Sequence, residues 1–288
     1  MTAIVHIAEN SILDVTSHER LSSQGLLIYP VVSRRSGGVS IGINLNPDKI
    51  CNFHCVYCQV NRNRPETVPV PSVRLILEQL KQFFIKIQES GGYWQEVPVC
   101  DIALSGDGEP TTFPEFDQLI PGLFELRQQF NLQHIPLVLI TNASCLHLSR
   151  IQKVLPIFIE NGGRIWAKLD AGDEKNWQQL MQTDVPFARI LNNLRNTGMK
   201  YKILLQSCFM QIHQQEFSPT LLDTYVSTVQ SLLNDKTQIQ EIQAYTIARP
   251  PANSFVRAWD DSVMDEIGKI LTRQIPVPVK IYYGRHFD

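Results

Sequence analysis

The sequence predicts an α/β protein whose parallel strands form an open, partial (β/α)6 barrel. Six apolar or alternating segments typical of strands are each followed by a segment of helical periodicity along the 288 residues. Six such units are fewer than the eight of a closed barrel, and no long linker or low-complexity run separates them. Active-site residues are therefore expected where the strands end, at their carboxyl termini.

The expected elements follow from local patterns taken in order. Ser40 to Asn46 alternates as a strand does, and apolar residues then recur at helical spacing from Val73 until Gly91-Gly92 ends the unit. Later units repeat this order, with turns such as Asn161-Gly162-Gly163 between them. The predicted strands are 40–46, 97–105, 136–142, 164–170, 202–210, 239–247 and 277–283. The predicted helices are 73–87, 116–124, 146–159, 174–181, 187–196, 219–233 and 261–271. Residues 1–39 are predicted to be an N-terminal extension that packs on a core of residues 40–288.

Composition narrows the class of protein. The apolar fraction of 43% is ample for a core, but no apolar run is long enough to span a bilayer. The first ten residues lack the pattern of a signal peptide, so we expect a cytoplasmic protein whose six cysteines are thiols or metal ligands. A net charge of −2 gives no general support for nucleic-acid binding. Around the cysteine loop, basic residues outnumber the acidic Asp48 and Glu66; they are Arg34, Arg35, Lys49, Arg62 and Arg64. They could form a local basic patch or simply a solvated loop surface.

Three cysteines stand within eight residues, with the spacing Cys51-x3-Cys55-x2-Cys58. Thiols this dense in one loop usually hold a metal. A structural zinc site takes four ligands and would have to use His54, which directly adjoins Cys55. An iron–sulfur cluster bound by three cysteines instead keeps one iron open for another ligand. The spacing favours a [4Fe–4S] cluster whose fourth iron binds a substrate or cofactor.

Polar residues and a glycine turn follow the predicted strands. The turn Gly106-Asp107-Gly108-Glu109 comes after the second strand, while Asn142 and Asp170 end later ones. Lys168 shares one face of its strand with Asp170 and is costly to bury unless it is paired or bound to a ligand. We therefore expect these residues on the same rim as the cysteine loop.

These motifs resemble those of the radical S-adenosylmethionine (SAM) enzymes. The likeness rests on the three cysteines, with Tyr57 before the last, and on the segment Ser105 to Thr111. The residues around these motifs are similar to those of bacterial relatives of the tRNA 4-demethylwyosine synthases. This narrower resemblance is carried by Val31 to Arg35, Ile41 to Asn46, Gly106 to Thr111 and Lys168 to Ala171. The specific matches cover residues 31–171, and the resemblance implies a partial (β/α)6 radical SAM barrel.

The resemblance also implies an activity. A [4Fe–4S] cluster held by Cys51, Cys55 and Cys58 would pass an electron to SAM and produce a 5′-deoxyadenosyl radical, which takes a hydrogen atom from a substrate not identified by the sequence. The electron would come from a donor such as flavodoxin or ferredoxin. The substrate could be a small molecule or an RNA nucleoside.

The resemblance, together with positions at strand ends, suggests roles for several residues. The resemblance implies that Tyr57 lies near the adenine of SAM, and the backbone of Gly106, Asp107, Gly108 and Glu109 near its amino group. The alternatives are a packed aromatic for Tyr57 and an ordinary tight turn for the glycine segment. Asn142, Lys168 and Asp170 are expected to contact the SAM ribose or carboxylate, with Lys168 also the candidate catalytic residue. A simple Lys168–Asp170 ion pair is the alternative. Gln206, Tyr245 and Arg249 are candidates for substrate contacts, with core or surface roles as alternatives.

The chain departs from the wyosine synthases at one point. Those enzymes carry a second iron–sulfur cluster, whereas this chain has no cysteine before Cys51. Cys100 lies early in its predicted strand, and no role follows for Cys145 or Cys208. We therefore do not expect the wyosine reaction itself. Two alternatives stay open: an RNA-modifying radical SAM enzyme and a non-enzymatic, zinc-stabilised binding module.

Overall fold

The computed structural model describes residues 5–6, 12–13, 25–62, 68–89, 98–251 and 253–285. The predictions that involve Arg64, Glu66, Gly91-Gly92 and Val97 lie outside these residues. The chain divides into two compact units. The first unit is Met1–Cys51, Arg62–Ile140 and Leu148–Arg164, and the second is Asn52–Asn61, Thr141–His147 and Ile165–Asp288.

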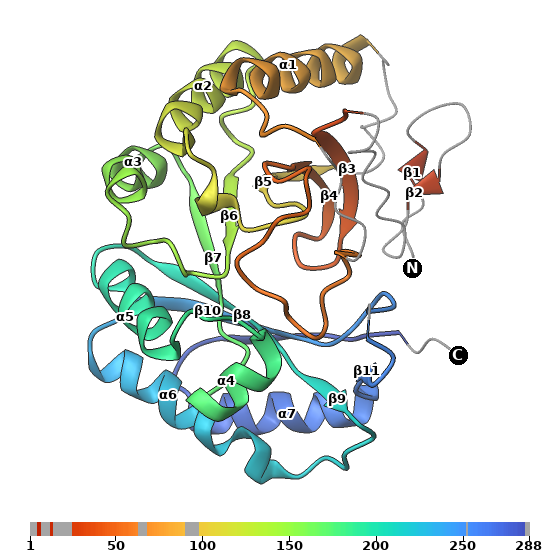
Figure 1. Ribbon diagram of the computed structural model, residues 1–288, viewed down its shortest axis with the longest axis vertical. Coiled ribbons are helices and arrows are strands. Elements are labelled where there is room, and N and C mark those ends of the chain that lie inside the picture. The colour runs from red at the N-terminus through yellow and green to blue at the C-terminus, as the bar shows by residue number, and fades with distance from the viewer. Residues whose placement is uncertain are drawn as a thin grey trace. The chain divides into compact units, whose positions relative to one another are not determined.

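The first unit holds four strands in the order β6-β5-β4-β3 (Figure 1). Neighbours β4, β5 and β6 run parallel, whereas β3 pairs antiparallel with β4. The central residues Ile41, Ile43 and Leu104 are at most 1% exposed, as expected of strands buried on both faces. The bounds are β3 Ile28–Ser33, β4 Gly38–Ile43, β5 Val99–Leu104 and β6 Leu137–Thr141. A separate antiparallel pair joins β1 Val5–His6 to β2 Ile12–Leu13.

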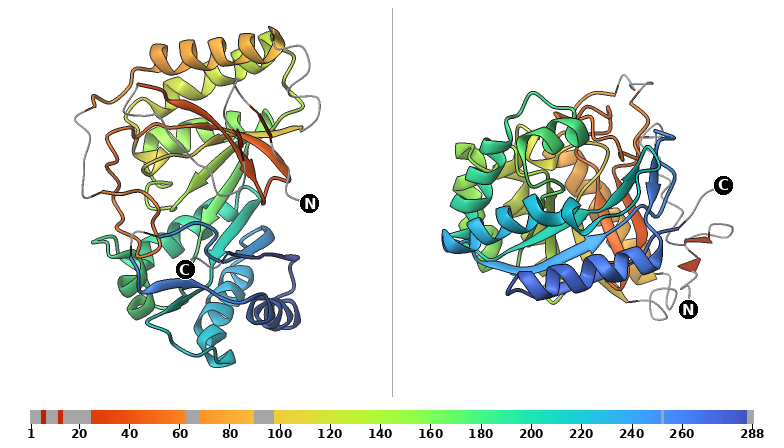
Figure 2. Two further views of the ribbon diagram at one scale, coloured as in Figure 1. Left: turned by 90° about the vertical axis from the view of Figure 1, so that its right-hand side faces the viewer. Right: turned by 90° about the horizontal axis from the view of Figure 1, so that it is seen from below.

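Three amphipathic helices lie together on one side of these strands (Figures 1 and 2). Each turns its apolar side to the core, as Ile76, Leu80 and Phe84 do in α1. The bounds are α1 Val73–Glu89, α2 Phe116–Gln129 and α3 Ser149–Glu160, with a 3₁₀ turn η2 at Pro110–Thr112.

The second unit contains four parallel strands in the order β7-β8-β10-β12. Their bounds are β7 Arg164–Lys168, β8 Ile203–Cys208, β10 Ile239–Tyr245 and β12 Val279–Tyr282. Helices α5, α6 and α7 cover one face of these strands, and a short antiparallel ribbon joins β9 to β11 (Figures 1 and 2). The remaining bounds are α4 Glu174–Met181, α5 Phe187–Gly198, β9 Met210–Ile212, η3 Pro219–Leu222, α6 Asp223–Asn234, β11 Val256–Ala258 and α7 Asp261–Gln274.

The predicted class and element order are confirmed: an α/β protein with mostly parallel strands, consistent with a partial radical SAM barrel. The structure corrects three details. Strand β3 lies inside the segment predicted as an extension, where hydrogen bonds to β4 stabilise it. The segment predicted as one strand over 202–210 ends at Cys208, and Met210 begins the ribbon strand β9. The helix predicted from Pro219 begins as the 3₁₀ turn η3 and becomes α-helical at Asp223. The division into residues 1–39 and 40–288 stays a prediction.

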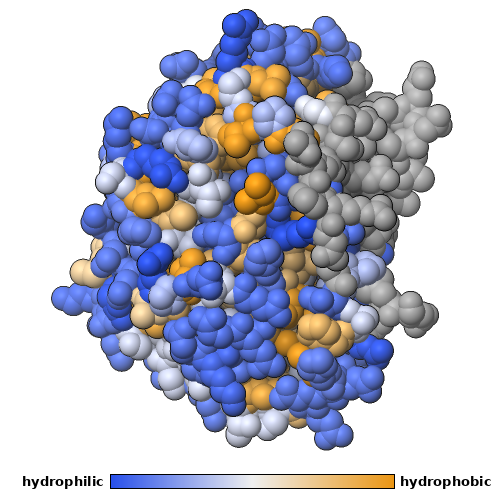
Figure 3. Space-filling model, viewed as in Figure 1, coloured by the Kyte–Doolittle hydropathy of each residue, from blue (hydrophilic) through white to orange (hydrophobic). Residues whose placement is uncertain are grey.

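No helix among the described residues is both long and apolar enough to cross a membrane. On the face shown in Figure 3, the described residues are mostly hydrophilic, with hydrophobic ones between them.

Candidate active site

The cysteine loop alternates buried apolar residues with half-buried thiols. Phe53 and Val56 are each 2% exposed, whereas Cys51, Cys55 and Cys58 are of intermediate exposure. The ring of Phe53 meets the ring of Trp177 edge-on, with centroids 5.2 Å apart. Burial of the two apolar side chains fixes the loop against the core and leaves the thiols toward its outer side.

The C-terminal end of α4 holds the backbone of this loop. The N–H groups of His54 and Val56 donate to the carbonyls of Met181 (3.0 Å) and Leu180 (2.9 Å). The last carbonyls of a helix have no partner within the helix, so they are available for such bonds. Gln182, with φ 45°, turns the chain away immediately after them. The Sγ atom of Cys55 lies 3.6 Å from Sδ of the buried Met181.

A ring of three polar side chains fixes the start of the loop. Asn142 Nδ2 donates to Asn52 Oδ1 (2.9 Å), Asn52 Nδ2 donates to Ser144 Oγ (2.7 Å), and Ser144 Oγ donates to Asn142 Oδ1 (2.6 Å). The hydroxyl of Thr183 also donates to the Asn52 carbonyl at 2.7 Å. The Asn142 amide, predicted to contact SAM, therefore makes hydrogen bonds that position the loop.

The glycine–glutamate turn belongs to the first unit, as does Cys51, and it packs on the residues that lead to that cysteine. Neither glycine has a positive φ; each is required because other atoms approach closely. A Cβ on Gly106 would lie 2.3 Å from Asn44 Oδ1, and one on Gly108 would lie 2.3 Å from the Ile50 carbonyl oxygen. The Asn44 amide makes two hydrogen bonds with Asp107. Its Nδ2 donates to Asp107 Oδ2 (2.6 Å), and its Oδ1 accepts from the Asp107 N–H (3.1 Å).

Glu109 ends this turn as a helix cap. It is 3% exposed, and its Oε1 accepts hydrogen bonds from the backbone N–H (3.1 Å) and the hydroxyl of Thr111. The carboxylate thereby stabilises the first turn of η2. One carboxylate oxygen is thus used by the protein itself.

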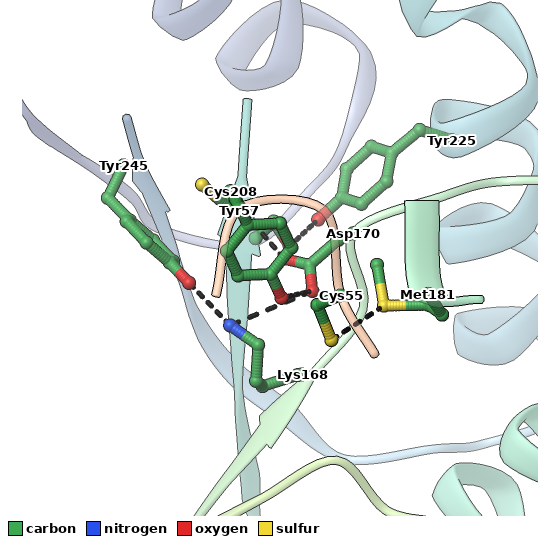
Figure 4. A network of polar contacts seen from close by, with 9 residues as sticks. Cys55, Tyr57, Lys168, Asp170, Met181, Cys208, Tyr225 and Tyr245 are labelled. Carbon is green, nitrogen blue, oxygen red and sulfur yellow. Dashed lines mark hydrogen bonds and ion pairs between the residues drawn. The ribbon is translucent and has the colours of Figure 1, made fainter. Parts of the chain in front are cut away.

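In the second unit, Lys168 lies between two tyrosines and a carboxylate (Figure 4). Its Nζ donates to the hydroxyl of Tyr245, lies 3.6 Å from Asp170 Oδ2, and is 4.9 Å and 5.1 Å from the ring centroids of Tyr57 and Tyr245. The Tyr57 hydroxyl donates to the same Asp170 oxygen at 2.6 Å, and the Cys208 N–H donates to the other at 2.6 Å. The predicted Lys168–Asp170 pair is therefore present, within a larger network.

This network keeps Lys168 charged and Tyr57 neutral. Burial lowers the pKa of Lys168, but the Asp170 carboxylate and Tyr245 outweigh it, so the net pKa lies above its ordinary value. Burial, followed by repulsion from Asp170, raises the pKa of Tyr57 well above its ordinary value. The site therefore offers a fixed ammonium group between two phenol rings, and the single O–H of Tyr57 is already donated to Asp170.

The other candidates occupy different positions. Gln206 is fully buried in β8, where its Nε2 donates to Gln243 Oε1 at 2.8 Å while its own Oε1 has no hydrogen-bond partner. Arg249 follows β10, and its carbonyl accepts from Gln59 of the cysteine loop at 3.2 Å. Cys100 lies at the second position of β5, where burial raises the pKa of its thiol. Tyr245 is hydrogen-bonded to Lys168, and Gln206 is the residue that pairs with Lys168 between β7 and β8.

Sequence reasoning missed the residues that hold the cysteine loop. Asn52, Ser144, Met181, Thr183 and Asn253 are ordinary residue types, and the last of them donates to the Val56 carbonyl at 2.8 Å from 197 positions along the chain. No local pattern marks contacts of that separation. Asn44, which holds the glycine turn, had a weak signal because it lies near the end of the predicted strand 40–46.

The family comparison decides the identity. The model of the radical SAM superfamily matches residues 45–205, which is more than half of the chain. The chain belongs to the radical SAM superfamily. This membership agrees with the family predicted from its cysteine and glycine motifs.

Similar proteins extend this result. The chain is 24% identical over 257 residues to a protein named GTPase Obg from Brachyspira hyodysenteriae, with 88% of this chain aligned to 34% of that one. It is 26% identical over 240 residues to a UPF0026 protein of Methanocaldococcus jannaschii, covering 83% of this chain and 68% of that protein. It is 28% identical over 200 residues to a UPF0026 protein of Synechocystis, covering 67% and 62%. The chain thus spans only about a third of the Brachyspira protein.

Among solved structures, the radical SAM fold of this chain is similar to that of TYW1 with a lysine–pyruvate adduct bound. The TM-score is 0.52 at 15% identity, with 91% of this chain and 78% of that chain covered. A second match is the crystal structure of archaeal TYW1, with a TM-score of 0.47 at 15% identity and coverage of 82% and 72%. The first of these matches confirms the wyosine-synthase-like resemblance at the level of fold alone.

The donor set fits the cluster that radical SAM enzymes use. Three thiols stand within eight residues, all are partly accessible, and none of the six cysteines forms a disulfide. Within the described part of the chain, no three His, Cys, Asp or Glu side chains are already arranged around a single metal position. The assignment of the cluster therefore depends on thiol spacing and accessibility. His54, the fourth ligand of the zinc alternative, is exposed to solvent.

Proposed function

We propose that this radical SAM enzyme binds a [4Fe–4S] cluster through Cys51, Cys55 and Cys58 and uses it to cleave SAM reductively. The observation that carries the proposal is the cysteine loop, in which Phe53 and Val56 are buried and the three thiols stay accessible. Such a loop presents its sulfur atoms outward on a backbone that α4 holds in place. The substrate that donates a hydrogen atom is not identified by these residues.

When bound, the cluster would supply the electron for reductive cleavage of SAM to methionine and a 5′-deoxyadenosyl radical, and that radical would take a hydrogen atom from the substrate. The protein binds and orients these groups. The backbone of Gly106 to Glu109 is the proposed support for the SAM amino group, and Tyr57 the proposed neighbour of the adenine. The physical support is that Asn44 and the buried Asp107 and Glu109 side chains fix the path of the turn.

Lys168 is proposed to hold an anionic or polar group of SAM or substrate as a permanent ammonium. Its Nζ already binds Tyr245 and Asp170 and faces two aromatic rings, all of which favour the charged form. A lysine that forms an imine must first lose its proton. We therefore propose that Lys168 does not form the kind of lysine–pyruvate adduct seen in the TYW1 structure. Incubation with pyruvate and borohydride, followed by peptide mass mapping, should find Lys168 unmodified. A trapped adduct at Lys168 would contradict this assignment.

The cluster is tested by replacing a cysteine. Anaerobically reconstituted Cys58→Ala should lose iron, sulfide and SAM cleavage, while Cys100→Ala should keep all three because Cys100 lies in β5, away from the loop in sequence. Cleavage of SAM by Cys58→Ala would refute the proposal. Colourless wild-type protein with stoichiometric zinc would instead support the zinc-stabilised binding module.

The substrate class can be sought with the same preparation. Reductant, SAM deuterated at the 5′ position and fractionated cell extract are combined with the reconstituted protein. The fraction that speeds release of 5′-deoxyadenosine, or acquires deuterium, contains the substrate. A flavodoxin or ferredoxin is the proposed electron donor, and the cytoplasm the proposed compartment.

An RNA nucleoside is the second candidate substrate. Arg34, Arg35 and Arg62 lie in the described part of the predicted basic patch, and the Arg62 guanidinium donates to the Lys49 carbonyl. If RNA binds there, its affinity should fall steeply as salt concentration rises. Absent or salt-independent RNA binding would exclude this candidate.

A further inference from the structure

The second unit contains a cavity of about 240 Å³ that none of the proposed catalytic steps uses. Its wall is formed by the loop after β7, the helix α4, the ribbon strand β9, the turn η3 and the start of α6. A volume of this size corresponds to about eight water molecules, and dry apolar cavities of about 150 Å³ are known to bind benzene.

Four aromatic side chains line the cavity in two pairs. Phe209 and Tyr225 meet edge-on with centroids 5.2 Å apart, and Phe217 and Trp259 do so at 5.8 Å. Rings in these arrangements offer both faces and edges to a third ring, which is how aromatic ligands are commonly held. Neutral polar side chains, among them Gln179, supply hydrogen-bonding groups.

The charge of the wall is already balanced. Asp170 is the single charged residue among those that line the cavity, its side chain is 1% exposed, and its oxygens bind Tyr57, Lys168 and the Cys208 N–H. The Tyr225 hydroxyl is likewise hydrogen-bonded to Ser207, at 2.7 Å. A charged ligand would find no opposite charge here and would lose its hydration.

We propose that this cavity binds a small, uncharged molecule with one or two fused aromatic rings. The site is separate from the proposed roles of the cysteines and of the glycine turn, and binding to it does not depend on the proposed function.

The cavity also touches residues that hold the cysteine loop. Leu180, which lines it, accepts the hydrogen bond of the Val56 N–H, and Asp170 accepts that of the Tyr57 hydroxyl. Leu180, Met210 and Ile212 pack on the same apolar cluster as Val56. A ligand that fills the cavity therefore restrains the far side of this loop.

Indole serves as the neutral probe, with indole-3-acetate and tryptamine as its anionic and cationic analogues. Binding to the anaerobically reconstituted full chain is measured by ligand-observed NMR. Indole should bind with a Kd of about 1 mM or below, the range expected for a ligand of nine heavy atoms. Both charged analogues should bind at least about tenfold more weakly. Tighter binding of either charged analogue, or no indole binding up to about 10 mM, would overturn the proposal.

Two variants locate the binding. Leu221→Trp enlarges an exposed residue of the wall, and Phe217→Ala removes one aromatic partner; each should weaken indole binding at least about tenfold. Ser227→Trp adds the same ring at an exposed position of α6 that does not line the cavity, and should leave binding unchanged. Indole binding that survives both wall variants at wild-type strength would refute the site.

Hydrogen exchange tests the contact with the loop. Saturating indole should slow deuterium uptake at the Val56 amide of the wild-type protein, and should do so much less in Leu221→Trp. Unchanged uptake with indole bound would refute the restraint on the loop.

Discussion

The hydroxyl of Tyr57 donates a 2.6 Å hydrogen bond to Oδ2 of Asp170, which lies 113 residues further along the chain. The other oxygen of the same carboxylate accepts the Cys208 N–H at 2.6 Å. One buried carboxylate thereby joins the cysteine loop, the end of β7 and the end of β8. It also lies beside the ammonium group of Lys168.

Loss of this hydrogen bond should destabilise the protein measurably. Tyr57→Phe leaves a buried carboxylate oxygen without one donor and should lower the free energy of unfolding by about 1–3 kcal/mol. Urea denaturation followed by circular dichroism measures the change. Tyr283→Phe is the matched control, because Tyr283 makes the same type of 2.6 Å bond to Asp265 but is 42% exposed. Its effect should stay within about 0.5 kcal/mol, and equal effects would contradict the importance of burial.

Asp170→Asn should be the more severe change. It removes the negative charge opposite Lys168, whose side chain is 21% exposed, and should cost about 3–5 kcal/mol. The same denaturation experiment checks it. A loss no greater than that of Tyr57→Phe would show that the Lys168 charge does not need Asp170.

The pH dependence of stability follows from the same network. The folded pKa values of Lys168 and Tyr57 are both raised, so each group stabilises the fold fully below its unfolded pKa and loses that contribution as pH rises toward the folded value. Since the unfolded pKa values are about 10.4 and 10, the network's contribution should be constant from about pH 7 to 9.5 and decline above about pH 10. Unfolding free energies across this range provide the test, and the decline should be shallower in Asp170→Asn. A network-dependent decline already between pH 7 and 9 would contradict the assigned protonation states.

Gly106→Ala should disrupt the glycine turn. Its Cβ would lie 2.3 Å from Asn44 Oδ1 and 2.9 Å from the Asn44 Cα, so the strand end must move. We expect a loss of about 2–4 kcal/mol in unfolding free energy, measured by urea denaturation. Gly122→Ala is the control, because its Cβ would meet the flexible end of Leu77 and because alanine favours the helix α2. A Gly106→Ala protein as stable as Gly122→Ala would contradict the close approach.

Asn52→Ala should loosen the start of the cysteine loop. The change removes the side-chain bonds to Asn142 and Ser144, and we expect about 1–3 kcal/mol of destabilisation. Uptake of deuterium over residues 51–58 should rise, and the bound cluster should be lost faster in air, as followed by its visible absorbance. Asn192→Ala, at an exposed position of α5, should behave as wild type. Unchanged exchange in Asn52→Ala would show that the loop does not depend on these side-chain hydrogen bonds.

The local patterns were sufficient for most of the fold. Helix α4 has the predicted bounds, and α5 and α7 extend a few residues past theirs, because apolar periodicity records which face of a helix is buried. Strand β3 was missed although Ile28, Tyr29 and Val31 favour a strand, since Pro30 interrupts the run and is tolerated only where β3 lies, at the edge of a sheet.

The sequence alone determined the family. The spacing of Cys51, Cys55 and Cys58 and the turn at Gly106 involve residues close together in the chain, so they can be recognised without the tertiary structure. The tertiary structure decided what surrounds them. Three features join residues more than 70 positions apart: the bonds of Asn52 to Asn142 and Ser144, the anchoring of the loop by α4, and the position of Lys168 between Tyr57 and Tyr245. Such contacts exist only once the chain has folded, because burial brings those side chains together and makes an unpaired polar group costly.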